Sequence, residues 1–356
     1  MKLRFYPFAL KFRHPFAIAS GKRDFTPVVY VELEYENKIG YGEAALPPYL
    51  PETQESVINF LSKINLKQFS TPLNKEIILD YVFSLSENDF SAKAAFDIAW
   101  HDLTGKILKM PNYKRFGLKK ENCPQTTFTI GMDTPKMILE KIQEAKDFNL
   151  LKIKLGGPFD KLIIETVRRE TDKPICVDAN QGWDEKEFAL DMIYYLKEQG
   201  AIFIEQPLEK NKFKDAQWLK EKSPLPIIAD EAVQTYDDFV RRDYFGERIQ
   251  DAYHGINIKL MKCGGMDMAL KMIFRAKELG LKILIGCMCE SSCGVSAAAQ
   301  LSPLCDWADL DGPLLISNDP FSGITYNKGM IVLNDLPGNG VKRLTEVHSA
   351  LTESKI

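Results

Sequence analysis

The stretch Leu151-Lys152-Ile153-Lys154-Leu155, followed at once by Gly156-Gly157-Pro158, decides how the rest of the chain is interpreted. Side chains alternate along a β-strand, so Lys152 and Lys154 share one face while the three apolar residues share the other. A Lys-x-Lys pair taken alone is typical of an edge strand with one solvated face. The alternative is that both ammonium groups point into a barrel or pocket, where each disfavours the charge of the other.

The sequence around this stretch alternates short apolar runs with helical segments, which is typical of βαβ units and a parallel sheet. Eight runs are expected to form strands, at residues 126–130, 151–155, 174–178, 201–205, 226–230, 255–259, 282–286 and 306–310. Eight parallel strands with crossover helices close naturally into a barrel. We therefore predict a (β/α) barrel over residues 123–315, in which the last helix, at 291–301, is short and rich in small residues.

The residues before the barrel predict a small α+β domain over residues 1–122. Its strands are expected at 3–12, 28–35 and 40–43, and its helices at 53–64, 75–85 and 91–109. A long loop at 14–27 and a proline-rich loop at 46–51 are candidate lids over a site, although plain surface connections explain them equally well. Residues 316–356, with a strand at 331–333, are expected to pack back on this first domain.

Ionisable residues stand at the carboxyl ends of five consecutive predicted strands, where barrel enzymes carry their chemistry. They are Lys154, Asp178, Glu205, Asp230 and Lys259. One acidic residue at such a junction is often only a helix N-cap. Three carboxylates in one barrel mouth repel each other unless a cation neutralises them, and an all-oxygen ligand set suits Mg²⁺. We predict one Mg²⁺ per subunit, held by Asp178, Glu205 and Asp230.

The two outer members of this series, Lys154 and Lys259, would lie on opposite sides of the carboxylates. If a substrate carboxylate binds Mg²⁺, removal of the neighbouring α-proton builds an enediolate that the cation stabilises. A lysine is a base near neutral pH only when its pKa is lowered, and Lys152, the metal and burial would all act in that direction. A base on one face and an acid on the other invert the α-carbon.

These residues together resemble the enolase superfamily, in the subgroup that is similar to muconate-lactonizing enzyme. The resemblance covers nearly the whole chain and implies an α+β capping domain with two substrate-covering loops and a modified TIM barrel, (β/α)7β. It also implies Lys154 and Lys259 as acid/base catalysts beside Mg²⁺, Lys152 as an electrostatic helper, and Glu231 as the residue that orients Lys259. No histidine occurs near residues 286–290, which separates the chain from the mandelate-racemase-like subgroup.

Within the subgroup, Asp309-Leu310-Asp311 resembles the Asp-x-Asp of dipeptide epimerases. Two carboxylates at this spacing can bind the α-ammonium group of a dipeptide. A turn is the alternative, since Asp311-Gly312-Pro313 is also good turn chemistry. The resemblance therefore implies an isomerase that inverts the α-carbon of the C-terminal residue of a dipeptide.

The side chain that this C-terminal residue carries is a separate question. Epimerases that act on Ala-Glu have an arginine where Gly21 aligns, so we expect a small or apolar residue, as in an Ala-Ala type of dipeptide. Lys22 or Arg23 could replace that arginine, which keeps an L-Ala-D/L-Glu epimerase as an alternative. Lys22, Met288 and Glu290 are further candidates for contacts with the substrate, although Met288 could equally be structural.

Composition restricts the partners and the compartment. The chain has 356 residues, is 45% hydrophobic and has a net charge of -3, which favours a small-molecule substrate over nucleic acid or an anionic membrane. No apolar run is long enough to span a membrane, and seven scattered cysteines argue against a disulfide framework. Cys287, Cys289 and Cys293 are close in sequence, and a zinc site there is a minor alternative to burial in the core. We expect a cytoplasmic homo-oligomer.

Three kinds of protein are alternatives to a dipeptide epimerase: another enolase-type enzyme, a Schiff-base aldolase and an inactive relative. A muconate cycloisomerase or an o-succinylbenzoate synthase would use the same superfamily machinery on a substrate without an ammonium group. A Schiff-base aldolase would use a barrel lysine but would not need three metal-binding carboxylates. An inactive relative would keep Mg²⁺ and its ligand without turnover, although it would have little use for both Lys154 and Lys259.

Overall fold

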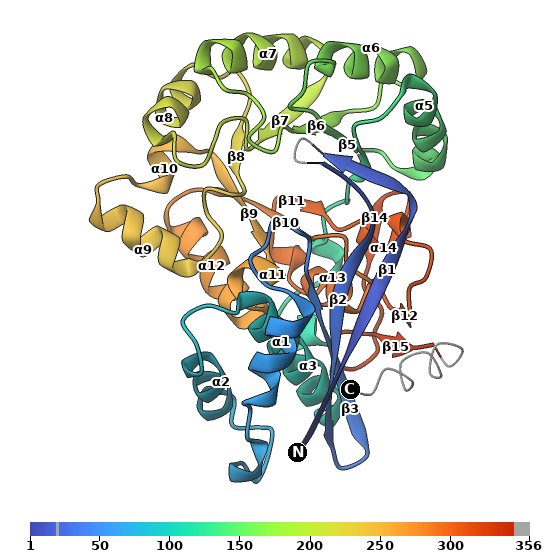
Figure 1. Cartoon of the computed structure of the whole chain (residues 1–356), viewed down its shortest axis with the longest axis vertical. Helices are drawn as coiled ribbons and strands as arrows, with labels where there is room; N and C mark the ends of the chain where they lie inside the picture. Colours follow the sequence, from blue (N-terminus) through green and yellow to red (C-terminus); the bar gives the residue numbers. More distant parts are fainter. Residues whose placement is uncertain (19–20, 345–356) are drawn as a thin grey trace.

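The computed structural model describes residues 1–18 and 21–344, and it has two parts (Figure 1). An antiparallel sheet with three longer helices forms the capping domain, and a parallel barrel with outer helices forms the rest. Of the described helices, none combines the length and the apolar character that crossing a lipid bilayer requires.

The barrel consists of eight parallel strands in sequence order, as predicted. They are β4 (Phe128–Ile130), β5 (Leu151–Lys154), β6 (Ile175–Asp178), β7 (Ala201–Glu205), β8 (Ile227–Ala229), β9 (Gly255–Lys259), β10 (Lys282–Gly286) and β11 (Trp307–Asp309). A parallel bridge between Thr126 and Ala308 connects the first strand to the last. Cys176, Phe203 and Leu284 pack together inside the barrel, so its lower part is a filled core.

Helices cover the outside of the barrel, because each crossover returns the chain to the amino end of the next strand. They are α5 (Pro135–Glu144), α6 (Asp160–Glu170), α7 (Lys186–Glu198), α8 (Phe213–Lys222), α9 (Tyr236–Tyr244), α10 (Ile249–Ala252), α12 (Met266–Glu278) and α13 (Ser292–Ala299). The short α11 (Leu260–Cys263) and α14 (Gly312–Leu315) follow directly after strand ends. Every residue of α13 is buried, which explains its small side chains.

The capping domain packs its longest helix flat on its sheet. Its strands are β1 (Lys2–Ile18), β2 (Gly21–Tyr35) and β3 (Lys38–Ala45), and its helices are α1 (Gln54–Ser62), α2 (Lys75–Ser84), α3 (Phe90–Ile107) and the single turn α4 (Asn112–Arg115). A Cβ atom on Gly42 of β3 would collide with the carbonyl oxygen of Ala95 in α3. Glycine at this position therefore permits the close contact that locks α3 onto the sheet.

The predicted loop at 14–27 is instead the end of a long hairpin. Strands β1 and β2 remain paired as far as Ile18 and Gly21, with a register shift between Lys11 and Phe16. This irregularity interrupts the alternation of side chains, which is why the sequence pattern indicated a loop. The resulting arm extends from the capping domain toward the barrel strands β5 and β6 (Figure 1).

The segment after residue 316 contacts both parts. Its hairpin of β13 (Thr325–Asn327) and β14 (Met330–Val332) bridges to Gln125 of the barrel, while β12 (Phe321–Ser322) pairs with β15 (Lys342–Arg343). Arg343 forms an ion pair with Glu32 of β2. The last twelve residues of the predicted segment 316–356 lie outside the described residues, and the predicted domain boundaries remain predictions.

Candidate active site

A cavity of about 400 Å³ opens at the carboxyl ends of the barrel strands, beneath the arm and the loop at 46–51. Its lining includes seven residues to which the sequence analysis gave a role, namely Lys154, Asp230, Glu231, Lys259, Met288, Asp309 and Asp311. Lys152, Asp178 and Glu205 are buried beside this lining, because Lys152 pairs with Asp309, Asp178 pairs with Lys154, and Glu205 pairs with Lys152. The structure therefore brings Lys152, Lys154 and Lys259 together with the predicted carboxylate series.

Lys152 is the centre of a buried ionic network. Its ammonium nitrogen lies 3.0 Å from Asp178 Oδ2, 2.7 Å from Glu205 Oε2 and 2.7 Å from Asp309 Oδ2. Burial opposes the charge on Lys152, but the three carboxylates outweigh it and raise the pKa of this lysine well above its usual range. Lys152 is therefore a permanent cation that balances the carboxylates.

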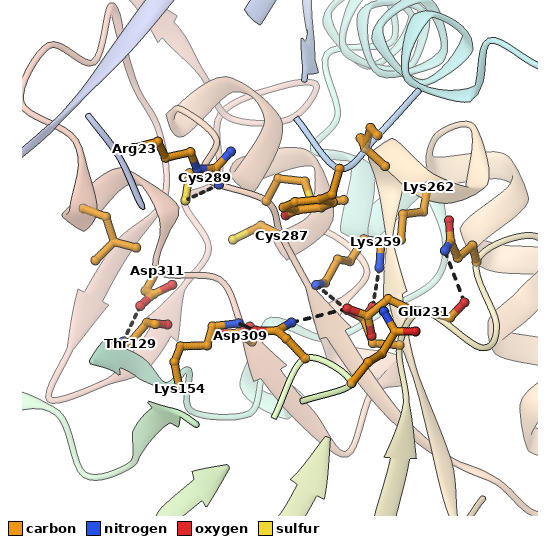
Figure 2. A pocket seen from close by; sticks show the side chains of 18 of the residues that line it. Arg23, Thr129, Lys154, Glu231, Lys259, Lys262, Cys287, Cys289, Asp309 and Asp311 are labelled. Atoms are coloured by element: carbon orange, nitrogen blue, oxygen red, sulfur yellow. Dashed lines mark hydrogen bonds and ion pairs between the residues drawn. The ribbon is translucent and has the colours of Figure 1, made fainter. Parts of the chain in front are cut away.

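The two candidate catalytic lysines reach the cavity from different strands (Figure 2). Lys154 Nζ lies 2.6 Å from Asp178 Oδ2 and donates to Asn180 Oδ1 at 3.2 Å. Lys259 Nζ lies 3.0 Å from Asp230 Oδ2. Burial disfavours the charge on Lys259, but the Asp230 and Glu205 carboxylates outweigh it and raise its pKa well above the usual range. Each amine thus stands beside a different candidate metal ligand.

The candidate metal ligands stand side by side, with Lys154 paired to Asp178 and Asp178 paired to Glu205 across neighbouring strands. Among the described residues, no three acidic, histidine or cysteine side chains converge closely enough to hold an ion as they stand. The carboxylate oxygens form ion pairs with lysine ammonium groups instead, and these groups take the place of the metal cation. A buried, all-oxygen set of three carboxylates fits Mg²⁺ once those ammonium groups move aside.

Asp309 and Asp311 differ in their surroundings although both line the cavity. Asp309 accepts hydrogen bonds from Thr127 Oγ1 and Lys152 Nζ, both at 2.7 Å. Asp311 accepts from the Thr129 backbone N–H at 2.6 Å, and burial together with the nearby Asp309 raises its pKa to about 7. A cationic substrate group beside Asp311 would relieve this repulsion.

Lys22 does not contribute to the cavity, contrary to the sequence-based expectation. It is exposed, whereas its neighbour Arg23 lines the cavity. The reason is the hairpin: side chains alternate along β2, so adjacent residues point to opposite faces. Arg23 Nη2 donates to Cys289 Sγ at 3.7 Å, and the guanidinium lies over the rings of Phe12 and Tyr49.

Glu290 also points away from the cavity, so its predicted contact with substrate is not supported. It accepts from the Met288 backbone N–H at 2.7 Å and faces Glu43 of β3, which accepts from Ser291 N at 3.0 Å and Gly294 N at 3.0 Å. The reason is that capping strand β3 delivers a second carboxyl group behind β10. Met288 lines the cavity and accepts a hydrogen bond from Tyr49 Oη at 3.2 Å.

We expect Glu290→Gln to make the protein more stable at high pH. Burial and the Glu43 carboxyl raise the pKa of Glu290 to about 8. When the pKa of a carboxyl group is higher in the folded state than in the unfolded state, its ionisation does not destabilise the fold below the unfolded pKa. The free energy of unfolding then falls as the pH rises from the unfolded pKa through the folded pKa. Glutamine cannot ionise, so the variant should exceed wild type by about 2–4 kcal/mol at pH 9 and match it near pH 5. Urea unfolding across this range measures the difference, and identical pH slopes would contradict it.

Lys262 in the cavity wall and the buried Asn257 were not assigned a role from the sequence. Lys262 Nζ lies 2.7 Å from Asp230 Oδ1, and Asn257 Nδ2 donates to Glu205 Oε1 at 2.7 Å. Asn257 precedes Lys259 by two residues, so strand alternation alone could have indicated it. Glu231 accepts from Asn180 Nδ2 at 3.3 Å, while the ion pair of Lys259 is with Asp230, so Glu231 does not orient Lys259 directly here.

The fold and this cavity define a barrel enzyme with a capping domain, and comparison with known families gives its class. Residues 4–117 match the family model described as "Mandelate racemase / muconate lactonizing enzyme, N-terminal domain", and residues 137–346 match "Enolase C-terminal domain-like". The chain belongs to the enolase superfamily. This result confirms the predicted superfamily, and the epimerases described next confirm the predicted isomerase class.

Particular relatives narrow the class further. An L-Ala-D/L-Glu epimerase from Bacteroides thetaiotaomicron is 54% identical over 345 residues, which are 97% of this chain and 88% of that protein. A dipeptide epimerase from Cytophaga hutchinsonii, solved with Mg and the dipeptide D-Ala-L-Val, is 26% identical and superposes with a TM-score of 0.88, covering 98% of this chain and 97% of that one. The L-Ala-D/L-Glu epimerase from Bacillus subtilis, solved with a substrate, is 26% identical with a TM-score of 0.86, covering 96% and 98%.

Proposed function

We propose that this protein is an Mg²⁺-dependent dipeptide epimerase whose preferred substrate carries an acidic C-terminal residue, as in L-Ala-D/L-Glu. The predicted dipeptide epimerase activity and the predicted Mg²⁺ cofactor are confirmed by the relatives that share them. The acidic preference replaces our expectation of a small or apolar residue. The observation that carries it is the position of Arg23 in the cavity wall.

Arg23 suits a carboxylate because its guanidinium presents several donors in one plane. Phe12 and Tyr49 contact it through their rings, and Cys289 contacts it through sulfur, so the group is held among weakly polar neighbours. Figure 2 shows Arg23 beside Cys289, with Lys259 and Lys262 on the other side of the pocket. A substrate side-chain carboxylate at Arg23 would form a charge-assisted pair within this partly desolvated setting.

The two ends of the substrate would then bind to opposite kinds of charge. Asp311, supported by Asp309, would hold the α-ammonium group of the N-terminal residue. Asp178, Glu205 and Asp230 would hold Mg²⁺, which when bound supplies a divalent charge for the substrate's α-carboxylate. The α-carbon of the C-terminal residue would lie between Lys154 and Lys259.

The reaction moves one proton from the substrate to one lysine and one proton from the other lysine to the substrate. Proton removal requires one lysine as its neutral amine, a form that would be favoured once Mg²⁺ in place of the ammonium group neutralised its carboxylate partner. That amine takes the α-proton, the C–H bond breaks, and its electron pair delocalises toward the substrate carboxylate. The ammonium group of the other lysine delivers a proton to the opposite face of the α-carbon. The substrate leaves inverted, and the two lysines have exchanged their protonation states.

The test incubates the purified protein with Mg²⁺ and a dipeptide library in D₂O. Deuterium should appear at the α-carbon of the C-terminal residue, most rapidly for dipeptides that end in Glu. If no dipeptide exchanges while a muconate or an o-succinylbenzoate precursor turns over, the epimerase proposal is wrong. Fastest exchange with Ala-Ala would refute the acidic preference alone.

We expect Arg23→Met to change the substrate preference. The variant should lose about 30- to 300-fold in kcat/KM with L-Ala-L-Glu, because a charge-assisted pair in a partly buried setting is lost. With L-Ala-L-Ala it should stay within about threefold, since that substrate presents no side-chain carboxylate. Lys22→Met is the matched control, because it removes an adjacent cation that is exposed on the opposite face of β2. Equal losses for both substrates would count against the role of Arg23.

We also propose that the protein is cytoplasmic and forms a homo-oligomer. All seven cysteines are unpaired, which suits a reducing compartment. Tyr244 and Phe245 at the end of α9 expose 84% and 69% of their surface, which is unusual for adjacent aromatic residues. Light scattering after size-exclusion chromatography measures the assembly directly.

A further inference from the structure

We propose that the capping domain positions Lys259, and that Ser91 and Asp97 of α3 are the positioning residues. This inference rests on the proposed two-lysine epimerisation. It makes one of the two proton transfers depend on the capping domain, while the other depends on the barrel alone. The argument begins with the segment that follows Lys259.

That segment, α11, is a single helical turn that follows Lys259 directly and contains Lys262, and both of these buried lysines bind Asp230. Helix α3 of the capping domain packs against it. Ser91 Oγ donates to the Met261 carbonyl at 3.2 Å, and the backbone N–H of Ala45 donates to Met261 Sδ at 3.3 Å. Two capping elements, α3 and β3, therefore hold Met261, which lies between Lys259 and Lys262 in the sequence.

A second contact fixes the end of α11. The chain turns through Gly264 and Gly265, which have φ angles of +97° and +116°, before α12 begins at Met266. Asp97 Oδ1 accepts from the Met266 backbone N–H at 2.5 Å and so caps the start of α12. A Cβ atom on Gly265 would collide with Asp97. Glycine is thus required here both for the backbone conformation and for the approach of the capping domain.

The contacting side of α3 is itself rigid. Glu52 accepts from the backbone N–H groups of Ser91 and Ala92 at 2.9 and 3.1 Å, which holds the first turn of the helix. Ser91, Asp97 and Met261 are completely buried. Lys75 of α2 adds an ion pair to Asp267 in the first turn of α12 at 2.9 Å. The capping domain thus forms a preorganised support for the segment that follows Lys259.

Lys154 is supported differently. The strand that carries it continues into Gly156 and Gly157, whose N–H groups donate to Asp160 at 3.1 and 2.9 Å. Asp160 accepts in turn from Trp183 Nε1 at 2.9 Å. All of these residues belong to the barrel. The two candidate bases therefore have supports in different parts of the chain.

This asymmetry has a kinetic consequence. In a two-base reaction each lysine takes the α-proton from one epimer only. A small displacement of one base is costly, because proton transfer requires close alignment. Loosening the contact between α3 and α11 should slow proton removal from the epimer that Lys259 serves and leave the other epimer nearly unaffected. A general loss of stability would slow both.

The experiment follows α-proton exchange in D₂O, separately for L-Ala-L-Glu and L-Ala-D-Glu, in wild type and in Ser91→Ala. Lys259→Ala, measured in parallel, identifies the epimer that depends on Lys259. We expect Ser91→Ala to slow exchange from that epimer about tenfold and to change the other by less than about twofold. Met261→Leu, which keeps the volume but removes the sulfur acceptor, should act in the same direction.

Thr104→Ala is the matched control, because it removes a buried hydroxyl of the same helix that donates to the Trp100 carbonyl at 2.9 Å and not to α11. It should leave both exchange rates unchanged. Equal slowing of both epimers by Ser91→Ala, slowing of the other epimer alone, or no slowing would each overturn the inference.

A readout independent of turnover separates this inference from the proposed function. Amide hydrogen exchange of residues 259–265, measured by mass spectrometry, should be at least about fivefold faster in Ser91→Ala than in wild type, while residues 151–157 stay unchanged. If the wild-type protein exchanges the α-proton of no dipeptide, the proposed function is wrong. Independently of that result, unaltered amide hydrogen exchange in Ser91→Ala would refute the proposal that Ser91 supports the segment after Lys259.

Discussion

Lys259→Ala is expected to abolish epimerisation, with a loss of at least about 10³-fold, while proton exchange continues from one epimer of the dipeptide. Lys154→Ala should do the same for the opposite epimer. The reason is that the lysine that remains can still remove the α-proton on its own face and return a deuteron there, but inversion requires a donor on the other face. Proton NMR of each pure epimer in D₂O, combined with a chiral assay of the product, measures both quantities.

A buried lysine outside the cavity provides the control for these variants. Lys141 is almost fully buried and pairs with Asp133 at 3.2 Å, so its replacement by alanine also removes a buried cation. Lys141→Ala should retain inversion in both directions. If either catalytic variant still epimerises at a rate near that of wild type, the two-base scheme is wrong.

The barrel and the carboxylate series were predictable because they depend on short-range rules. Parallel strands joined by crossover helices end at one edge of the barrel, so Asp178, Glu205 and Asp230 had to meet there once the strands were recognised. The alternation of side chains within β5 likewise placed Lys152 on the same face as Lys154, two residues further from the carboxyl end of the strand. No long-range pairing information was necessary for these residues.

The errors concern residues whose orientation depends on distant partners. Whether Lys22 or Arg23 enters the cavity depends on the pairing of β1 with β2, and the bulge after Lys11 conceals that register in the sequence. Glu290 turns toward Glu43, a residue of the capping domain that nothing near β10 in the sequence indicates. To place Lys262 in the site, one would have to know that a helical turn follows Lys259 directly.

Removal of Mg²⁺ is expected to eliminate the activity, with a loss of at least about 10³-fold, and readdition should restore it. Glu205→Gln should weaken Mg²⁺ binding by about 100-fold, because a neutral amide replaces the buried carboxylate between two other candidate ligands. Isothermal titration calorimetry, or Mn²⁺ titration followed by electron paramagnetic resonance, measures this affinity without turnover. Unchanged affinity in Glu205→Gln would exclude Glu205 as a ligand.

The same removal should hardly affect the fold, because the carboxylates already have partners without the ion. Lys154 balances Asp178, Lys152 balances Glu205, and Lys259 with Lys262 balances Asp230. The stabilisation by Mg²⁺ should therefore follow simple mass action, about 2.7 kcal/mol at a hundredfold excess over Kd. Thermal unfolding in EDTA should remain cooperative with a Tm only a few degrees lower. Loss of cooperative unfolding in EDTA would mean that the lysines do not replace the metal charge, and that the ion is structural.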